Sequence, residues 1–119
     1  MKIAIPTDGK NGLDERVAYH FGRCATYTIL DEEGNVVEII DNTSEHFGGR
    51  GMPAELLKER NVDVLLCRGI GPRAIELANN LGMDVYVGEA ESVKDMFKLW
   101  KSGKLKKATL DDTCGDHKV

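Results

Sequence analysis

The sequence predicts an α/β fold in which three helices pack on a mixed β-sheet. The first half of the chain holds three β-rich runs, and a glycine-containing turn separates two of them. The second half alternates short apolar runs with stretches whose apolar residues recur at helical spacing. A change of period from two to about 3.6 is typical of a hairpin followed by βα units. The 119 residues suffice for a single domain.

Five strands are expected, beginning at the N-terminus. The first run alternates apolar residues. The second and third runs flank Glu32-Glu33-Gly34-Asn35, which indicates a hairpin with a glycine turn. The last two are short apolar runs of the kind that form buried strands. In chain order the expected strands are 2–6, 25–31, 36–41, 62–67 and 83–87.

Three helices are expected after the hairpin, at about 52–60, 72–81 and 93–102. Pro53 falls in the first turn of the first helix, where a missing N–H costs least. Gly82 and Gly103 would end the second and third helices, and Ser92 would cap the third. The expected apolar stripes are Ala54, Leu56 and Leu57; Ala74, Leu77, Ala78 and Leu81; and Val93, Met96, Phe97 and Trp100.

The order of these elements predicts how the sheet is assembled. The hairpin makes the second strand antiparallel to the third, and right-handed crossovers add the fourth and fifth strands parallel to the first. The expected strand order is 3-2-1-4-5 with strand 2 antiparallel, which is the ribonuclease-H-like three-layer arrangement. Residues 1–105 would form this domain, and the polar residues 106–119 are expected to form a flexible tail.

Four loops should meet at one edge of this sheet, where ligands of open α/β sheets bind. They follow the first, third, fourth and fifth strands, at 7–24, 43–51, 68–71 and 88–91. Thiolate and imidazole are the ligands that soft metals and metal–sulfur clusters prefer, and arginine and loop N–H groups suit anionic sulfides. The candidate residues at this rim are Asp8, His20, Phe21, Gly22, Arg23, Cys24, His46, Gly48, Gly49, Arg50, Gly51, Cys67 and Arg68.

Several of these candidates also have a plainer interpretation. Cys67 ends a buried strand, where a cysteine is typically a small core residue. His20 could cap a hairpin, and His46 could be a surface residue without a role. Cys114 and His117 have CxxH spacing, which could hold half of a metal site in the tail, but no pair has the closed spacing of a structural zinc site.

Charge and composition exclude other classes of function. The net charge of −4 argues against a protein that coats nucleic acid, because phosphate neutralisation needs clustered Lys and Arg. No apolar run approaches the roughly 20 residues that span a bilayer, and the N-terminus does not resemble a signal peptide. The three cysteines cannot all pair, which argues against a secreted disulfide framework. We therefore expect a cytoplasmic protein with neither nucleic-acid nor membrane partners.

Three segments in this order resemble a known family. His20–Arg23 precedes a strand, the glycine-rich segment His46–Leu57 follows, and Val62-Asp63-Val64 then leads to Gly69–Ala74. Over about residues 1–105 this combination is similar to the dinitrogenase iron–molybdenum cofactor biosynthesis family, which includes nitrogenase cofactor carriers and small stand-alone relatives. The ending Thr113–His117 resembles the Cys/His endings of many small members.

The resemblance implies a ribonuclease-H-like fold and non-catalytic binding or carriage of a metal–sulfur cluster containing iron, molybdenum or both. Proteins that donate and accept the cluster are the implied partners. Family motifs match at His20–Gly22, His46–Gly49 and Gly69–Gly71. The rim chemistry adds Arg23, Cys24 and Arg50 to the cofactor-binding candidates. The expected metal ligands are His20, Cys24 and His46, with Cys114 and His117 as a weaker pair.

Other classes of function stay open at this point. Gly69-x-Gly71-x-x-Ala74 follows a strand and opens a helix, as in a dinucleotide-binding turn, although Pro72 removes one N–H there. The same glycines could simply permit a tight turn. Nuclease chemistry needs several carboxylates, whereas only Asp8 is well placed and the fourth strand ends in Cys67-Arg68. A protein-binding adaptor is a further alternative, for which Lys98, Lys101, Lys104, Lys106 and Lys107 could dock an acidic partner.

Overall fold

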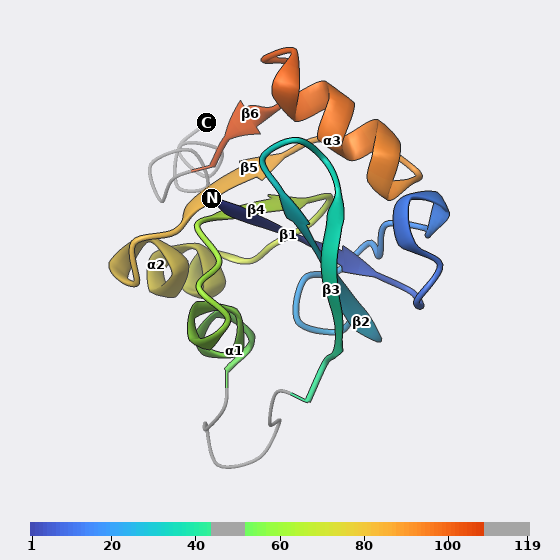
Figure 1. The fold of residues 1–119 in the computed structure, drawn as a ribbon. Helices are drawn as coiled ribbons and strands as arrows, with labels where there is room; N and C mark the ends of the chain where they lie inside the picture. Colours follow the sequence, from blue (N-terminus) through green and yellow to red (C-terminus); the bar gives the residue numbers. More distant parts are fainter. Residues whose placement is uncertain (44–51, 109–119) are drawn as a thin grey trace.

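The computed structural model describes residues 1–43 and 52–108 (Figure 1). Within them a single mixed sheet has the strand order β3-β2-β1-β4-β5-β6. Its members are β1 (Lys2–Thr7), β2 (Thr26–Asp31), β3 (Val36–Asp41), β4 (Val64–Cys67), β5 (Asp84–Val87) and β6 (Lys106–Lys107). The hairpin β2–β3 is antiparallel, β2 is antiparallel to β1, and β4 and β5 follow β1 in parallel. The predicted order and directions of the first five strands are confirmed.

The prediction of five strands is wrong by one. The sixth strand, β6, pairs antiparallel with β5, with Tyr86 opposite Lys107. It lies at the start of the segment expected to be a tail, and residues 109–119 lie outside the described residues. Two consecutive lysines carry no apolar pattern that predicts a strand. Strand β6 is defined only by its backbone pairing with β5, which the local sequence does not reveal. The mixed α/β architecture is as predicted, and the finer ribonuclease-H-like assignment stays a prediction.

Three helices pack on the two faces of the sheet, as Figure 1 shows. They are α1 (Pro53–Glu59), α2 (Pro72–Asn80) and α3 (Val93–Lys101), and a short 3₁₀ turn, η1 (Gly12–Asp14), precedes them. Helices α1 and α2 bury Ala54, Leu57, Ile75 and Ala78 in one apolar cluster, and α3 buries Val93 and Met96 in the other.

The alternation of side chains along the central strands produces these two cores. Ala4 of β1 belongs to the cluster under α1 and α2, whereas its neighbours Ile3 and Ile5 belong to the cluster under α3. Leu65 and Leu66 of β4 divide in the same way. Because successive strand residues point to opposite faces, one central strand supplies both layers of the core.

The helix termini are mostly those predicted. The Ser92 hydroxyl accepts a hydrogen bond from the Asp95 N–H at 3.1 Å, so Ser92 is the cap of α3. Gly82 and Gly103 end α2 and α3 with φ of +85° and +72°, a conformation that glycine adopts without strain. In α2 the fully buried residues include Ile75, which the predicted stripe left out, while Ala74 and Leu77 are only half-buried.

Candidate functional site

The loop after β1 crosses the carboxyl ends of the parallel strands and is bonded to each neighbouring loop. The Val17 N–H donates to the Glu91 carbonyl after β5 at 2.8 Å, and the Phe21 N–H donates to the Gly69 carbonyl after β4 at 2.9 Å. The Asn42 N–H after β3 donates to the Ala25 carbonyl at 2.9 Å. The predicted convergence of these loops is therefore confirmed for their described residues.

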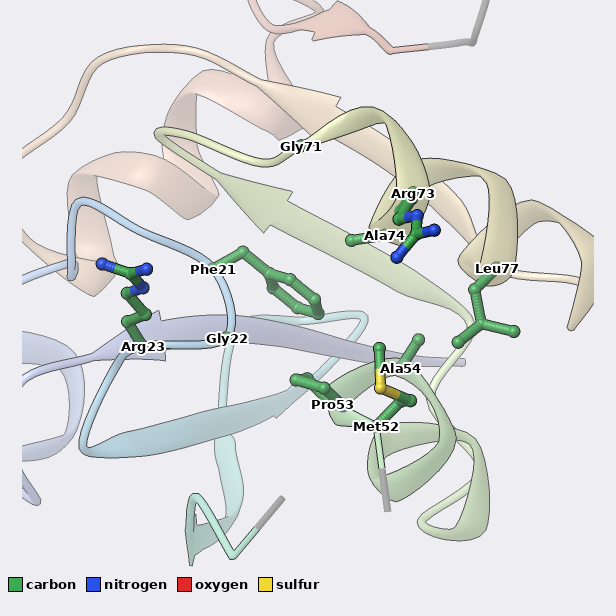
Figure 2. Close-up of a pocket in the computed structure, with 10 residues that line it drawn as sticks. All are labelled: Phe21, Gly22, Arg23, Met52, Pro53, Ala54, Gly71, Arg73, Ala74 and Leu77. Carbon is green, nitrogen blue, oxygen red and sulfur yellow. The ribbon is translucent and has the colours of Figure 1, made fainter. Parts of the chain in front are cut away.

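A cavity of about 520 Å³ opens where this loop meets the first turns of α1 and α2 (Figure 2). Its walls are mostly apolar, with the Phe21 ring and the Arg73 side chain pointing toward the central space. Met52, the first described residue after 44–51, also belongs to the wall. The lining residues are Phe21, Gly22, Arg23, Met52, Pro53, Ala54, Gly71, Arg73, Ala74 and Leu77.

Two arginines belong to the cavity wall, and in Figure 2 the Arg73 side chain points into the central space whereas the Arg23 side chain points away from it. Arg23 comes from the loop after β1 and Arg73 from the first turn of α2, and both are exposed. Neither forms an ion pair with any other residue of the described ranges 1–43 and 52–108, whereas Arg16 and Arg68 do. An arginine without a carboxylate partner keeps its donors for a ligand, so this cavity suits an anion with apolar surface.

Two other arginines at this edge are paired with carboxylates. Arg68 donates to a Glu89 carboxylate oxygen at 3.0 Å and its guanidinium lies over the Tyr19 ring at 5.3 Å. The Asp8 carboxylate lies 3.9 Å from the Arg16 guanidinium. Asp8 thus has a cationic partner, and it is not joined by further carboxylates in a metal-holding group within the described residues.

Two cysteines and a tyrosine lie in the core that underlies the Phe21 side of the cavity. Burial raises the pKa of the Cys67 thiol and of the Cys24 thiol, so both are neutral at pH 7. Burial also raises the pKa of Tyr27, and the neighbouring Cys24, once it is a thiolate at high pH, adds to this effect. The Tyr27 ring packs 5.7 Å from the Phe21 ring, centroid to centroid. Its hydroxyl is buried and meets no partner at ordinary hydrogen-bond geometry within the described part of the chain, although the Cys24 thiol and the Gly22 backbone lie near enough to affect its pKa.

Asn42 holds the backbone that forms one wall of the cavity. Its side-chain Nδ2 donates to the Gly22 carbonyl at 3.0 Å and to the Cys24 carbonyl at 2.9 Å. Gly22 itself has φ of +93° and lines the cavity. A single amide therefore ties the end of β3 to the segment that carries Arg23.

The predicted site residues are only partly brought together. His20 is exposed, forms a parallel bridge with Gly69, and packs edge-on against Tyr19 with ring centroids 4.6 Å apart. Cys24 is only 7% exposed, in contrast to the open rim position expected for a ligand. The predictions for His46, Gly48, Gly49, Arg50, Cys114 and His117 lie outside the described residues. Within the described ranges no group of three or more His, Cys, Asp or Glu side chains is arranged to hold a metal ion.

Sequence reasoning missed Arg73, Asn42 and the apolar lining of the cavity. Arg73 lies within the segment Gly69–Ala74 that carries the resemblance, but it is on a helix surface, where arginine is common, and neither spacing nor periodicity marks it as a site residue. One signal was available: Ala74 and Leu77 continue the apolar stripe of α2 beyond the residues that the core buries. Asn42 follows a strand directly, which is a typical place for a side chain that bonds to a neighbouring loop.

Comparison with known proteins shows where this fold and site belong. The dinitrogenase iron-molybdenum cofactor family model matches residues 1–103. The protein MJ0580 of Methanocaldococcus jannaschii is 35% identical over 113 residues, which cover 90% of this chain and 91% of that protein.

Solved structures show the same fold. The Thermotoga protein TM1290 has a TM-score of 0.76 and 30% identity, with 89% of this chain and 91% of that chain covered. The apo form of the orange protein from Desulfovibrio gigas has a TM-score of 0.79 and 27% identity, with coverage of 90% and 92%. Because the family model spans most of the chain, this protein belongs to the dinitrogenase iron-molybdenum cofactor family.

Proposed function

We propose that this protein binds and carries an anionic metal–sulfur cluster, of the iron–molybdenum type or a precursor of it. The proposed site is the cavity between the loop after β1 and the first turns of α1 and α2. One observation carries the proposal: apolar walls are combined there with two arginines, Arg23 and Arg73, that have no acidic partner within the described ranges. Family membership supports this class of cargo.

The lining suits the surface of such a cluster. Bridging and terminal sulfides are polarisable and accept hydrogen bonds weakly, so aromatic and thioether groups such as Phe21 and Met52 are favourable neighbours. The net negative charge of the cluster is offset by guanidinium groups. In support, the neighbouring orange protein structure is an apo form, a description that presupposes a bound group in that protein.

We infer carriage rather than turnover. The buried thiols of Cys24 and Cys67 have raised pKa values, which disfavours the thiolate that a nucleophile or a strong metal ligand needs. Few direct ligands allow a carrier to release its cargo. His20 at the exposed rim, and His46 beyond the described residues, stay predicted ligands, as do the donor and acceptor proteins and the cytoplasmic location.

Anaerobic loading tests the proposal. The protein is mixed with tetrathiomolybdate and ferrous iron, desalted, and measured for bound metal and visible absorption. We expect a coloured complex of defined stoichiometry, and Arg73→Ala should weaken retention about tenfold, as the loss of one charge-assisted contact implies.

Arg60→Ala is the matched control for the loss of an arginine. Arg60 pairs with Glu38 and is not part of the cavity wall, so its replacement should leave retention unchanged. The proposal fails if the parent protein retains no metal. It also fails if Arg73→Ala and Arg60→Ala lose metal to the same extent.

A nucleotide is the second candidate cargo, and one specific observation favours it. Gly71, Arg73 and Ala74 of the G-x-G-x-x-A turn line the cavity. Pro72, however, leaves the first turn of α2 with one N–H fewer for a pyrophosphate. Saturable difference spectra with NAD or FAD that Arg73→Ala abolishes would favour the nucleotide over the cluster.

A further inference from the structure

Gly69 and Gly71 lie two residues apart in the turn from β4 to α2, but their surroundings differ. A Cβ atom built on Gly69 would lie 2.9 Å from the Tyr19 carbonyl oxygen, closer than real Cβ atoms approach backbone. Gly69 also pairs with His20 as a parallel bridge. Glycine at position 69 is therefore required by the close approach of the loop after β1.

Gly71 has no such requirement. Its φ of −83° and ψ of 165° lie in the extended region that any residue adopts, including one that precedes a proline. Apart from its own chain neighbours and the adjacent helix backbone, no atom of the described residues lies within 4 Å of the position that its Cβ would take. Neither backbone conformation nor packing within the described chain explains a glycine here.

Among the described glycines, only Gly71 combines a negative φ with open space at the position of its Cβ. Each of the others either has a positive φ or would bring a Cβ within 3 Å of another atom. Those with positive φ are Gly12, Gly22, Gly34, Gly82 and Gly103, and those with negative φ and a close approach are Gly9, Gly69 and Gly88.

The position of Gly71 in the helix makes the missing side chain more notable. Gly71 is the N-cap of α2 and provides no side-chain cap, whereas Ser92 at the same position of α3 caps the Asp95 N–H. Its extended dihedral angles match those in which Ser, Asn or Asp cap a helix. Glycine is itself accepted at an N-cap, and serine at position 71 would stabilise α2 slightly more, so the capping position does not require glycine.

Gly71 faces the cavity and forms part of its wall together with Arg73 and Phe21 (Figure 2). We propose that Gly71 determines the size of the cargo: its missing side chain leaves the space that the ligand occupies at the first turn of α2. This inference rests on the proposed function and assigns to Gly69 and Gly71, matched by one motif, two different roles.

Two substitutions at position 71 and one at position 69 test it, with thermal unfolding and retention of tetrathiomolybdate and ferrous iron as the readouts. Gly71→Ser should unfold at or above the temperature of the parent, and Gly71→Val slightly below it, because valine is a poorer N-cap than glycine. Retention should fall about tenfold for serine and further for valine, because the added atoms occupy ligand space. Gly69→Ala should lower the unfolding temperature.

The outcomes separate this inference from the proposed function. If the parent retains metal and both Gly71 variants retain it equally well, the size-determining role is wrong and the carrier function stands. If Gly71→Ser unfolds at clearly lower temperature than the parent, Gly71 is structural and the inference is also wrong. If the parent retains no metal, the proposed function fails and this inference fails with it.

Discussion

Replacing Tyr27 by Phe should stabilise the fold. The Tyr27 side chain is fully buried, and its hydroxyl finds no hydrogen-bond partner within the described ranges. A buried polar group without a partner loses its hydrogen bonds to water on folding and gains nothing in return. Phenylalanine keeps the ring and its contact with Phe21 but removes that loss.

The magnitude follows from the desolvation of one hydroxyl. An unsatisfied buried group costs about 1–3 kcal/mol, and the nearby Cys24 thiol, a weak acceptor, offsets part of this. We expect Tyr27→Phe to raise the free energy of unfolding by about 1 kcal/mol. For a domain of this size that corresponds to a rise in melting temperature of about 4 °C.

Urea unfolding followed by the fluorescence of Trp100, the chain's one tryptophan, measures the change. Tyr19→Phe is the matched control, because Tyr19 is 54% exposed and its hydroxyl can bond to water. The control should change stability by less than about 0.5 kcal/mol. A clear loss of stability in Tyr27→Phe would refute the reasoning, since it would mean that the hydroxyl is satisfied, by the Cys24 thiol or by a buried water molecule.

Three further predictions concern the same half of the sheet and the hairpin. Burial raises the pKa of the Cys67 thiol above its ordinary 9.0, so with rising pH the unfolded chain loses this proton before the folded protein does. The free energy of unfolding in urea should therefore be at its full value below about pH 8 and fall above pH 9 by up to about 1.4 kcal/mol per pH unit. The slope should be shallower in Cys67→Ala. Asn42→Asp places a carboxylate against two carbonyl oxygens and should cost about 1–3 kcal/mol at pH 7.5 but less at pH 4.5, where the carboxyl is protonated and can donate. Gly34→Ala should cost about 1–3 kcal/mol in thermal unfolding, because its φ is +92° and its Cβ would lie 2.7 Å from the Phe97 ring.

The part of the fold that the sequence predicts depends on local patterns that repeat. The apolar run at residues 2–6 suffices to predict β1, and in the structure Ile3 and Ile5 pack on the face opposite Ala4, so that the strand is buried on both faces. The glycine of the hairpin and the crossovers of the two βα units then determine the strand order. Strand β6 escapes prediction because its lysines carry no pattern, and charged residues are common on sheet edges.

The candidate site is predicted less well, because side-chain access is a tertiary property. Topology alone brings the loops after β1, β3, β4 and β5 to one edge, and hydrogen bonds confirm this for their described residues. Topology does not reveal that Cys24, directly before β2, is covered and lies next to Tyr27. Its role as a ligand stays a prediction and requires the thiol to become accessible.

The apolar stripe of α2 shows why the cavity itself was missed. Helical periodicity assigns Ala74 and Leu77 to the core, since an apolar residue on a helix face is most often buried. Both are instead half-buried in the cavity wall, next to an arginine without an acidic partner in the described ranges. An apolar sequence pattern predicts that one face of a helix is shielded from water, but it does not predict which part of the protein or which ligand covers that face. In this chain Gly71 lies between that stripe and the loop after β1. Neither its backbone conformation nor its described neighbours require a glycine, and this observation bears on what covers the stripe. If the role proposed for Gly71 is correct, a ligand, rather than another part of the described fold, covers the first turn of α2.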